Sequence, residues 1–174
     1  MVLDNGQMGI HAGKKHIILA LDPGRDKTGF AFVNHDGGLI LSGIFATSDS
    51  AKFFEAVKCN TQTLCEYITE GNFDLLPKNL TACIEFIAVG NGTHSKEFTA
   101  QVSANLPCEI VIADERNTTL EARELYWQIH KPGFLMRLIP QGLRVPDRIL
   151  DDLAAWAIAL RALKKYRDIS RNKL

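Results

Sequence analysis

The order of apolar segments along the chain is the feature that most limits its fold. Three strand-length apolar runs come first, and helical and strand-length segments alternate after them. The expected strands cover 16–22, 29–34, 39–46, 81–89 and 109–113, and the expected helices cover 50–70, 95–104, 120–130 and 147–167. A Gly-Gly turn joins the second and third strands, which indicates antiparallel neighbours. The sequence therefore predicts an α/β fold with a mixed five-stranded sheet, its first three strands antiparallel, and helices on both faces.

Length and composition indicate a single domain. The 174 residues are 46% hydrophobic and 23% charged, which are ordinary values for a globular protein that buries its own core. We expect residues 1–14 to form a flexible extension and residues 15–174 to form one domain. The formal net charge of zero gives no global basic field, although local patches decide whether a protein binds nucleic acid. No apolar run has the length of a membrane span or of a secretory signal, so we expect a cytoplasmic location and no membrane partner.

Acidic residues stand where the apolar segments end. Asp22 ends the first expected strand, and Asp114 and Glu115 follow the last one. Asp151 and Asp152 directly precede the apolar stretch of the last expected helix. Because that helix is apolar nearly all round, it should be largely buried, and at least one of its two acids should point towards the sheet. The pattern does not decide which of the two does so.

Such acids have two interpretations. An unpaired buried carboxylate is unfavourable and takes up a proton unless a cation compensates its charge. A hard divalent cation such as Mg²⁺ binds through carboxylate oxygens, and two such ions can hold the attacking and leaving oxygens of a phosphodiester. The alternative is that each acid caps a turn or the first turn of a helix. The spacing alone leaves both interpretations open.

Three motifs that contain these acids resemble those of a known family. The turn Asp22-Pro-Gly-x-x-x-Thr-Gly29 is similar to the first strand and turn of the RuvC-type branch of the RNase H-like superfamily. The segment Asp114-Glu-Arg-Asn-Thr-Thr-Leu-Glu-Ala-Arg123 resembles the D-E-R-x-T-T-x-x-A-R motif of the YqgF (RuvX) family. Asp151-x-x-Ala-Ala155 resembles the D-x-x-A-A of that family's final helix. The motifs occur in the family's order and span residues 16–165.

The resemblance implies an RNase H-like fold and a metal-dependent endonuclease that hydrolyses phosphodiester bonds of Holliday-junction DNA or of ribosomal RNA precursors. It implies that Asp22, Glu115 and Asp151 are catalytic and hold Mg²⁺ or Mn²⁺, with Asp114 and Asp152 as supporting acids. The partner would then be branched DNA or structured RNA. A homodimer is a further expectation, because junction resolvases cut two symmetric strands.

Two segments depart from the family pattern. Val89-Gly-Asn-Gly-Thr-His-Ser95 replaces a G-L-P-type sequence and resembles the YqgF-like domain of the transcription accessory protein Tex, which is regarded as non-catalytic. RuvC resolvases carry a glutamate at the end of the fourth strand, where this chain has Gly90 or Asn91, and Glu115 matches the glutamate that replaces it in the YqgF pattern. A catalytically inactive nucleic-acid-binding module is therefore an alternative function. A structural or regulatory protein without a nucleic-acid role is a third, and the neutral net charge favours it.

Polar residues near the motifs are candidates for binding phosphate. They are Lys27, Thr28, Asn91, Thr93, Arg116 and Arg123. The glycine-rich segment before the expected helix 95–104 would offer free N–H groups, and arginine is a bidentate donor to phosphate. Each has a structural alternative, because a turn lysine is often only solvated and Arg123 would equally pair with Glu121 or Asp114.

Two more patterns lie in the last third of the chain. Thr118-x-x-Glu121 predicts a capping box at the start of the helix 120–130. Between Arg161 and Lys173 lies the chain's one cluster of basic residues, which is a candidate for non-specific binding to a nucleic-acid backbone but is also common at helix ends.

Overall fold

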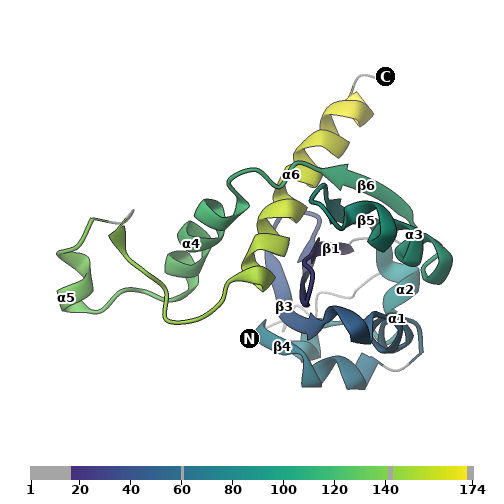
Figure 1. Ribbon diagram of the computed structural model, residues 1–174, viewed down its shortest axis with the longest axis horizontal. Coiled ribbons are helices and arrows are strands. Elements are labelled where there is room, and N and C mark those ends of the chain that lie inside the picture. Colours follow the sequence, from purple (N-terminus) through teal and green to yellow (C-terminus); the bar gives the residue numbers. More distant parts are fainter. Residues whose placement is uncertain (1–16, 60, 141–142, 172–174) are drawn as a thin grey trace, which may run out of the picture.

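The centre of the protein is a six-stranded mixed sheet with the strand order β4-β3-β2-β1-β5-β6 (Figure 1). The computed structural model describes residues 17–59, 61–140 and 143–171, so the expected N-terminal extension, 1–14, lies outside the described residues. The strands are β1 (Ile17–Pro23), β2 (Lys27–Asn34), β3 (Leu39–Ala46), β4 (Ile68–Gly71), β5 (Ile84–Gly90) and β6 (Glu109–Ala113). β1, β5 and β6 are parallel, whereas β2 pairs antiparallel with β1 and β3. The predicted α/β class and the antiparallel first three strands are confirmed.

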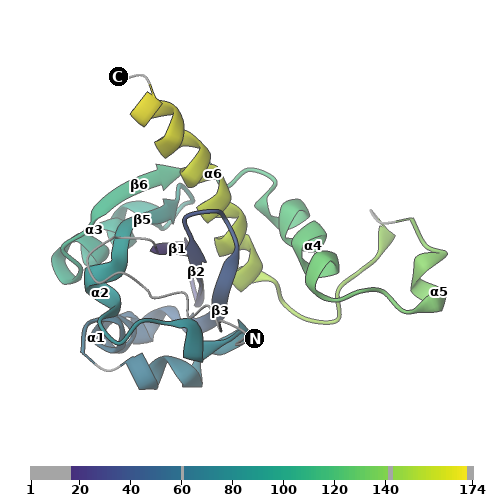
Figure 2. The same cartoon turned by 180° about the vertical axis from the view of Figure 1, so that it is seen from behind.

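Helices lie on both faces of the sheet because each strand alternates between two apolar clusters. The helices are α1 (Ser50–Lys58), α2 (Leu80–Cys83), α3 (Ser95–Asn105), α4 (Thr118–Ile129), α5 (Phe134–Arg137) and α6 (Asp151–Arg171). Leu19 and Leu21 of β1 pack with α1 and α3, whereas Ile18 and Ala20 pack with α4 and α6. Small alanine side chains on the second face and on α6 let this buried helix lie close to the sheet (Figures 1 and 2).

The strand β4 is not among the five that the sequence predicts. It lies inside the segment 50–70, which was expected to be one helix, but α1 ends at Lys58 and the 3₁₀-helix η2 (Thr61–Glu66) follows. The physical reason is the free edge of β3, whose backbone groups need partners. The N–H of Ile44 donates to the Tyr67 carbonyl, and the N–H of Asn72 donates to the Ile40 carbonyl, both at 3.0 Å. Tertiary pairing therefore outweighs the helical spacing of the apolar residues.

The segment between α4 and α6 also differs from the prediction. The short helix α5 lies inside 131–146, which was expected to be a loop, and α6 begins at Asp151 rather than at 147. The side chains of Asp147 and Arg148 instead bond to other elements, to the Tyr126 hydroxyl and to the Asp152 carboxylate respectively. Two further 3₁₀-helices, η1 (Thr47–Asp49) and η3 (Phe73–Leu75), flank α1 and β4.

The predicted capping box at the start of α4 is wrong. The residue that precedes the helix is Asn117, which has a left-handed backbone with φ 64° and makes no side-chain capping bond. The Thr118 hydroxyl donates to the Glu115 carbonyl at 2.8 Å, and the Glu121 carboxylate accepts from Arg161. The side chains of Thr118 and Glu121 thus bond to other groups and not to the backbone N–H groups at the start of the helix. Over the described ranges, no helix combines the length and apolar character that crossing a membrane demands.

Candidate functional site

Asp22 lies near the carboxyl end of β1, in the middle of the sheet. The parallel strands β5 and β6 end at the same edge, where Gly90 pairs with Ala113. Glu115 follows two residues after β6 and therefore reaches the edge on which Asp22 lies. An open cleft of about 540 Å³ at this edge is lined by Asp22, Glu115 and Thr93, among others.

Two glycines make room for the Glu115 carboxylate. A Cβ atom on Gly90 would lie 3.1 Å from Glu115 Oε2 and 3.5 Å from Asp22 Oδ1, so both carboxylates face the same small volume. A Cβ atom on Gly92 would lie only 2.5 Å from Glu115 Oε1. Between them, the side-chain oxygen of Asn91 accepts the Glu115 N–H at 3.0 Å. The Gly-Asn-Gly segment therefore positions Glu115 beside Asp22.

Asp151 is brought to the same edge by Gly29. Gly29 is the register partner of Asp22 in β2, and a Cβ atom there would collide with the backbone carbonyl of Asp151. Only a glycine lets the start of α6 lie against the sheet at this point. Burial and the neighbouring Asp152 raise the pKa of Asp151, and the positive charge of Lys27 opposes both. Lys27 therefore lies near this acid.

Asp22 is repelled by both of the other acids. Burial, and then the charges of Glu115 and Asp151, raise the pKa of Asp22 to about 7. A cation would relieve this repulsion, and carboxylate oxygens are the ligands that hard divalent ions prefer. In the described part of the chain no three acidic, histidine or cysteine side chains converge closely enough to hold one ion. The donor set thus fits Mg²⁺ or Mn²⁺ in charge and chemistry, and side-chain rotation would be needed to bring all three acids to one ion.

The two predicted supporting acids point elsewhere. Asp152 is fully buried, and its carboxylate accepts from the Ser42 hydroxyl at 2.9 Å and from Arg148 at 2.8 Å. Asp114 is half exposed, and its carboxylate accepts the Arg116 N–H at 3.0 Å. The structure brings Asp22 together with Glu115 and Asp151, and leaves Asp114 and Asp152 in other contacts.

The candidate phosphate ligands also differ: some are exposed near the site acids, and others are buried or already bonded within the chain. Thr93 lines the cleft, and Lys27 is exposed near Asp151. Thr28, in contrast, is buried, and its hydroxyl lies 3.0 Å from the Thr47 hydroxyl. Asn91 is exposed, but its side-chain oxygen is taken by Glu115.

The two arginine candidates differ in exposure. Arg116 is exposed, whereas Arg123 is half-buried on α4, and Glu121 pairs with Arg161 rather than with Arg123. Arg25, which also lines the cleft, was not predicted, although its place in the turn after Asp22 is the signal that could have identified it.

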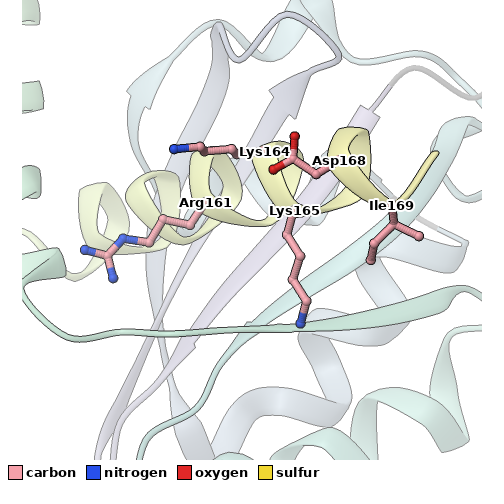
Figure 3. A pocket seen from close by; sticks show the side chains of 5 residues that line it. All are labelled: Arg161, Lys164, Lys165, Asp168 and Ile169. Atoms are coloured by element: carbon pink, nitrogen blue, oxygen red, sulfur yellow. The ribbon is translucent and has the colours of Figure 1, made fainter. Parts of the chain in front are cut away.

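The basic cluster of α6 is partly engaged in contacts within the chain. Figure 3 shows Arg161, Lys164 and Lys165 along one stretch of the helix. Arg161 Nη2 donates to Glu121 at 2.6 Å and its Nη1 donates to the Asp114 carbonyl at 2.7 Å. Arg161 thereby ties α6 to the loop that carries Glu115. Lys173 lies outside the described residues.

Comparisons with known proteins do not identify the chain. No model of a protein family matches it, and no curated protein matches it either. Its function must therefore be inferred from the motifs and from the geometry of the site.

Proposed function

We propose that the chain is a metal-dependent endonuclease of the RNase H-like type, related to the YqgF family, that hydrolyses phosphodiester bonds of structured nucleic acid. One observation carries the proposal: acids from three distant parts of the chain lie at one sheet edge, where burial, and then the charges of Glu115 and Asp151, raise the pKa of Asp22 to about 7. Perturbed carboxylates in an open cleft are typical of functional sites.

The topology supports the RNase H-like fold. Without the edge strand β4, the strand order is β3-β2-β1-β5-β6, with antiparallel first strands and helices on both faces, as the sequence resemblance implies. Each of the three resembling motifs also contributes one acid to the site, namely Asp22, Glu115 and Asp151. The agreement between motif and place in the fold supports the proposal more than either does alone.

In this proposal Asp22, Glu115 and Asp151 hold Mg²⁺ or Mn²⁺. A divalent ion bound there would supply Lewis-acid activation of water and stabilise negative charge at the phosphorus. The chain's own residues do the rest: Asn91 fixes the backbone of Glu115, and Arg25 and Lys27 attract the flanking phosphates. The cleft is open, as access for a nucleic-acid backbone requires.

Parallel cleavage assays in Mn²⁺ test the proposal. The substrates are a four-way DNA junction, single-stranded DNA and a ribosomal RNA precursor, and the wild-type chain should cleave at least one of them. Asp22→Asn should lower the rate by roughly 100-fold or more, because loss of even an outer-shell partner of a metal site costs 10–100-fold. Asp36→Asn, an exposed acid of the β2–β3 turn, serves as the matched control and should retain full activity. Undiminished cleavage by Asp22→Asn would refute the proposal.

A second function is a nucleic-acid-binding module without catalysis. The observation that favours it is the lack of three ligands converging on one ion among the described residues, together with the Tex-like segment that contains Asn91. This function predicts binding to junctions or structured RNA that persists in EDTA, with no product in Mn²⁺. The same set of substrates therefore separates the two functions.

A further inference from the structure

The described residues between α4 and α6, 130–140 and 143–150, project from the body of the protein and carry the short helix α5 (Figures 1 and 2). We call these residues the arm. Large apolar side chains on it face solvent: Phe134, Leu138, Ile139, Leu143, Val145 and Ile149. Phe134 is 80% exposed, and Leu138, which follows directly after α5, is 73% exposed. An exposed apolar surface of this kind marks a contact with another molecule.

Both ends of the arm are held by one carboxylate. Glu70 Oε1 in β4 lies 2.7 Å from His130 Nε2, where the arm begins, and 2.7 Å from Arg148 Nη2, where it ends. Arg148 also donates to Asp152 at 2.8 Å, and the Tyr126 hydroxyl donates to Asp147 at 2.7 Å. The arm is therefore a loop with a fixed base, and that base adjoins Asp151 of the candidate site.

Positive charge accompanies the apolar side chains of the arm. Asp147 is the arm's one acid in the sequence, against Lys131, Arg137 and Arg144, whereas the charge of Arg148 is paired with Glu70 and Asp152. Arg137 Nε donates to the Pro132 carbonyl at 3.1 Å and Arg144 Nε donates to the Ile139 carbonyl at 2.8 Å. These acceptors are neutral, so they fix the two side chains without cancelling their charge.

The combination favours nucleic acid over a second copy of the chain. In a two-fold dimer through this surface one arm would meet the other, which would bring two positively charged segments together. Unpaired bases, in contrast, present flat apolar faces next to phosphates, and proteins bind them with apolar wedges or aromatic rings beside cations. The exposed Phe134 and Leu138, with Arg137 between them in sequence, offer both kinds of contact.

We propose that the arm binds unpaired bases of a branched or looped nucleic acid next to the carboxylate site, with Phe134 and Leu138 against the base faces. This inference rests on the proposed function and adds to it the feature that selects the substrate. A fully paired duplex has no free base faces to offer the arm. The arm should therefore contribute to affinity for junctions and loops and contribute little to affinity for a blunt duplex.

The test compares a double variant, Phe134→Ala with Leu138→Ala, with the wild-type chain. Dissociation constants are measured by fluorescence anisotropy in EDTA on a four-way junction, a stem-loop and a blunt duplex of equal charge. The double variant should bind the junction and stem-loop about tenfold more weakly, because stacking on one base is worth about 1–3 kcal/mol. Its affinity for the duplex should change less than about twofold. Leu75→Ala, which removes an exposed apolar side chain far from the arm in sequence, is the control and should bind all three normally.

Three outcomes would overturn the inference. The first is an unchanged affinity for the junction, and the second is an equal loss on the blunt duplex. The third is a wild-type dimer that the double variant converts to a monomer in light scattering, with normal junction binding per chain, since the arm would then be a dimer contact. Because binding is measured in EDTA, failure of the nuclease proposal is seen separately: arm-dependent binding without cleavage in Mn²⁺ supports this inference and refutes catalysis.

Discussion

Two groups of acids adjoin through the neighbouring residues Asp151 and Asp152 at the start of α6, and they differ in how their charge is compensated. The site group contains Asp22, Glu115 and Asp151, whose mutual repulsion adds to burial in raising the pKa of Asp22 to about 7. The arm-base group contains Glu70 and Asp152, which share Arg148. There, although burial opposes it, the bonds from His130 and Arg148 lower the pKa of Glu70.

The difference shows that burial alone does not identify a ligand. Asp152 is the more buried of the two adjacent acids of α6, yet its oxygens accept from Ser42 and Arg148. Asp151 is less buried, and the charged groups that act on it are Asp152 and Lys27 rather than Arg148. We infer that the arm-base acids stabilise the fold, and that the site acids bind a cation.

The largest expected effect separates the two adjacent acids of α6. Asp152→Ala should lower the free energy of unfolding by about 3 kcal/mol, because it leaves Arg148 without its buried partner. Asp151→Ala should change it by less than about 1 kcal/mol, because it removes a charge that is repelled at its site. Urea unfolding of both variants measures the difference. Equal losses would mean that the two acids belong to one structural group.

The second prediction concerns how the site is built into the sheet. Gly29→Ala should lower the free energy of unfolding by about 2 kcal/mol and weaken Mn²⁺ binding, since the added Cβ must push Asp151 away from Asp22. Gly133→Ala is the control, because open space surrounds that position in the arm. Isothermal titration with Mn²⁺ and urea unfolding measure the two effects. Normal Mn²⁺ affinity in Gly29→Ala would show that Asp151 is not a ligand.

The placement of Asp22 and Glu115 at one sheet edge could be predicted from the sequence because it depends on local patterns. Asp22 stands near the end of one apolar strand and Glu115 follows another, and parallel strands bring their ends to one edge. The choice between Asp151 and Asp152 could not be made, because it depends on where Ser42 and Arg148 lie in the folded chain.

The strand β4 could not be predicted either, because it too depends on contacts between elements. Its four residues alternate only weakly between partly buried and exposed side chains. They form a strand because they pair with the free edge of β3. The arm-base group could not be predicted for the same reason, because Glu70 lies in β4 and its partners are about 60 or more residues away in sequence. Local patterns predict elements and their ends, whereas an ion-pair network between elements appears only in the fold.

The third prediction uses the pH dependence of the site group. Asp22 titrates at about 7 in the folded chain against 3.8 for an unperturbed group. Between these values the folded chain holds a proton that the unfolded chain has released, so the free energy of unfolding should fall as the pH rises from about 4 to 7. In the proposed function a divalent cation would replace that proton. Mn²⁺ should therefore raise the Tm by about 4 °C near pH 8 and hardly at all near pH 5. Asp22→Asn should abolish both effects in calorimetry, and a cation effect equal at both pH values would contradict the assignment.

The smallest expected effect has the opposite sign and belongs to the arm-base group. Because the pKa of Glu70 is lowered from 4.5, its contribution to stability is present above that pH and is lost as the pH falls below it. Glu70→Gln should therefore reduce the acid loss of stability by about 0.5–1 kcal/mol. Urea unfolding at a series of pH values below 5 measures this loss. An acid loss equal to that of the wild-type chain would show that the bonds from His130 and Arg148 to Glu70 do not contribute to stability, and the contrast between the two groups of acids would then be wrong.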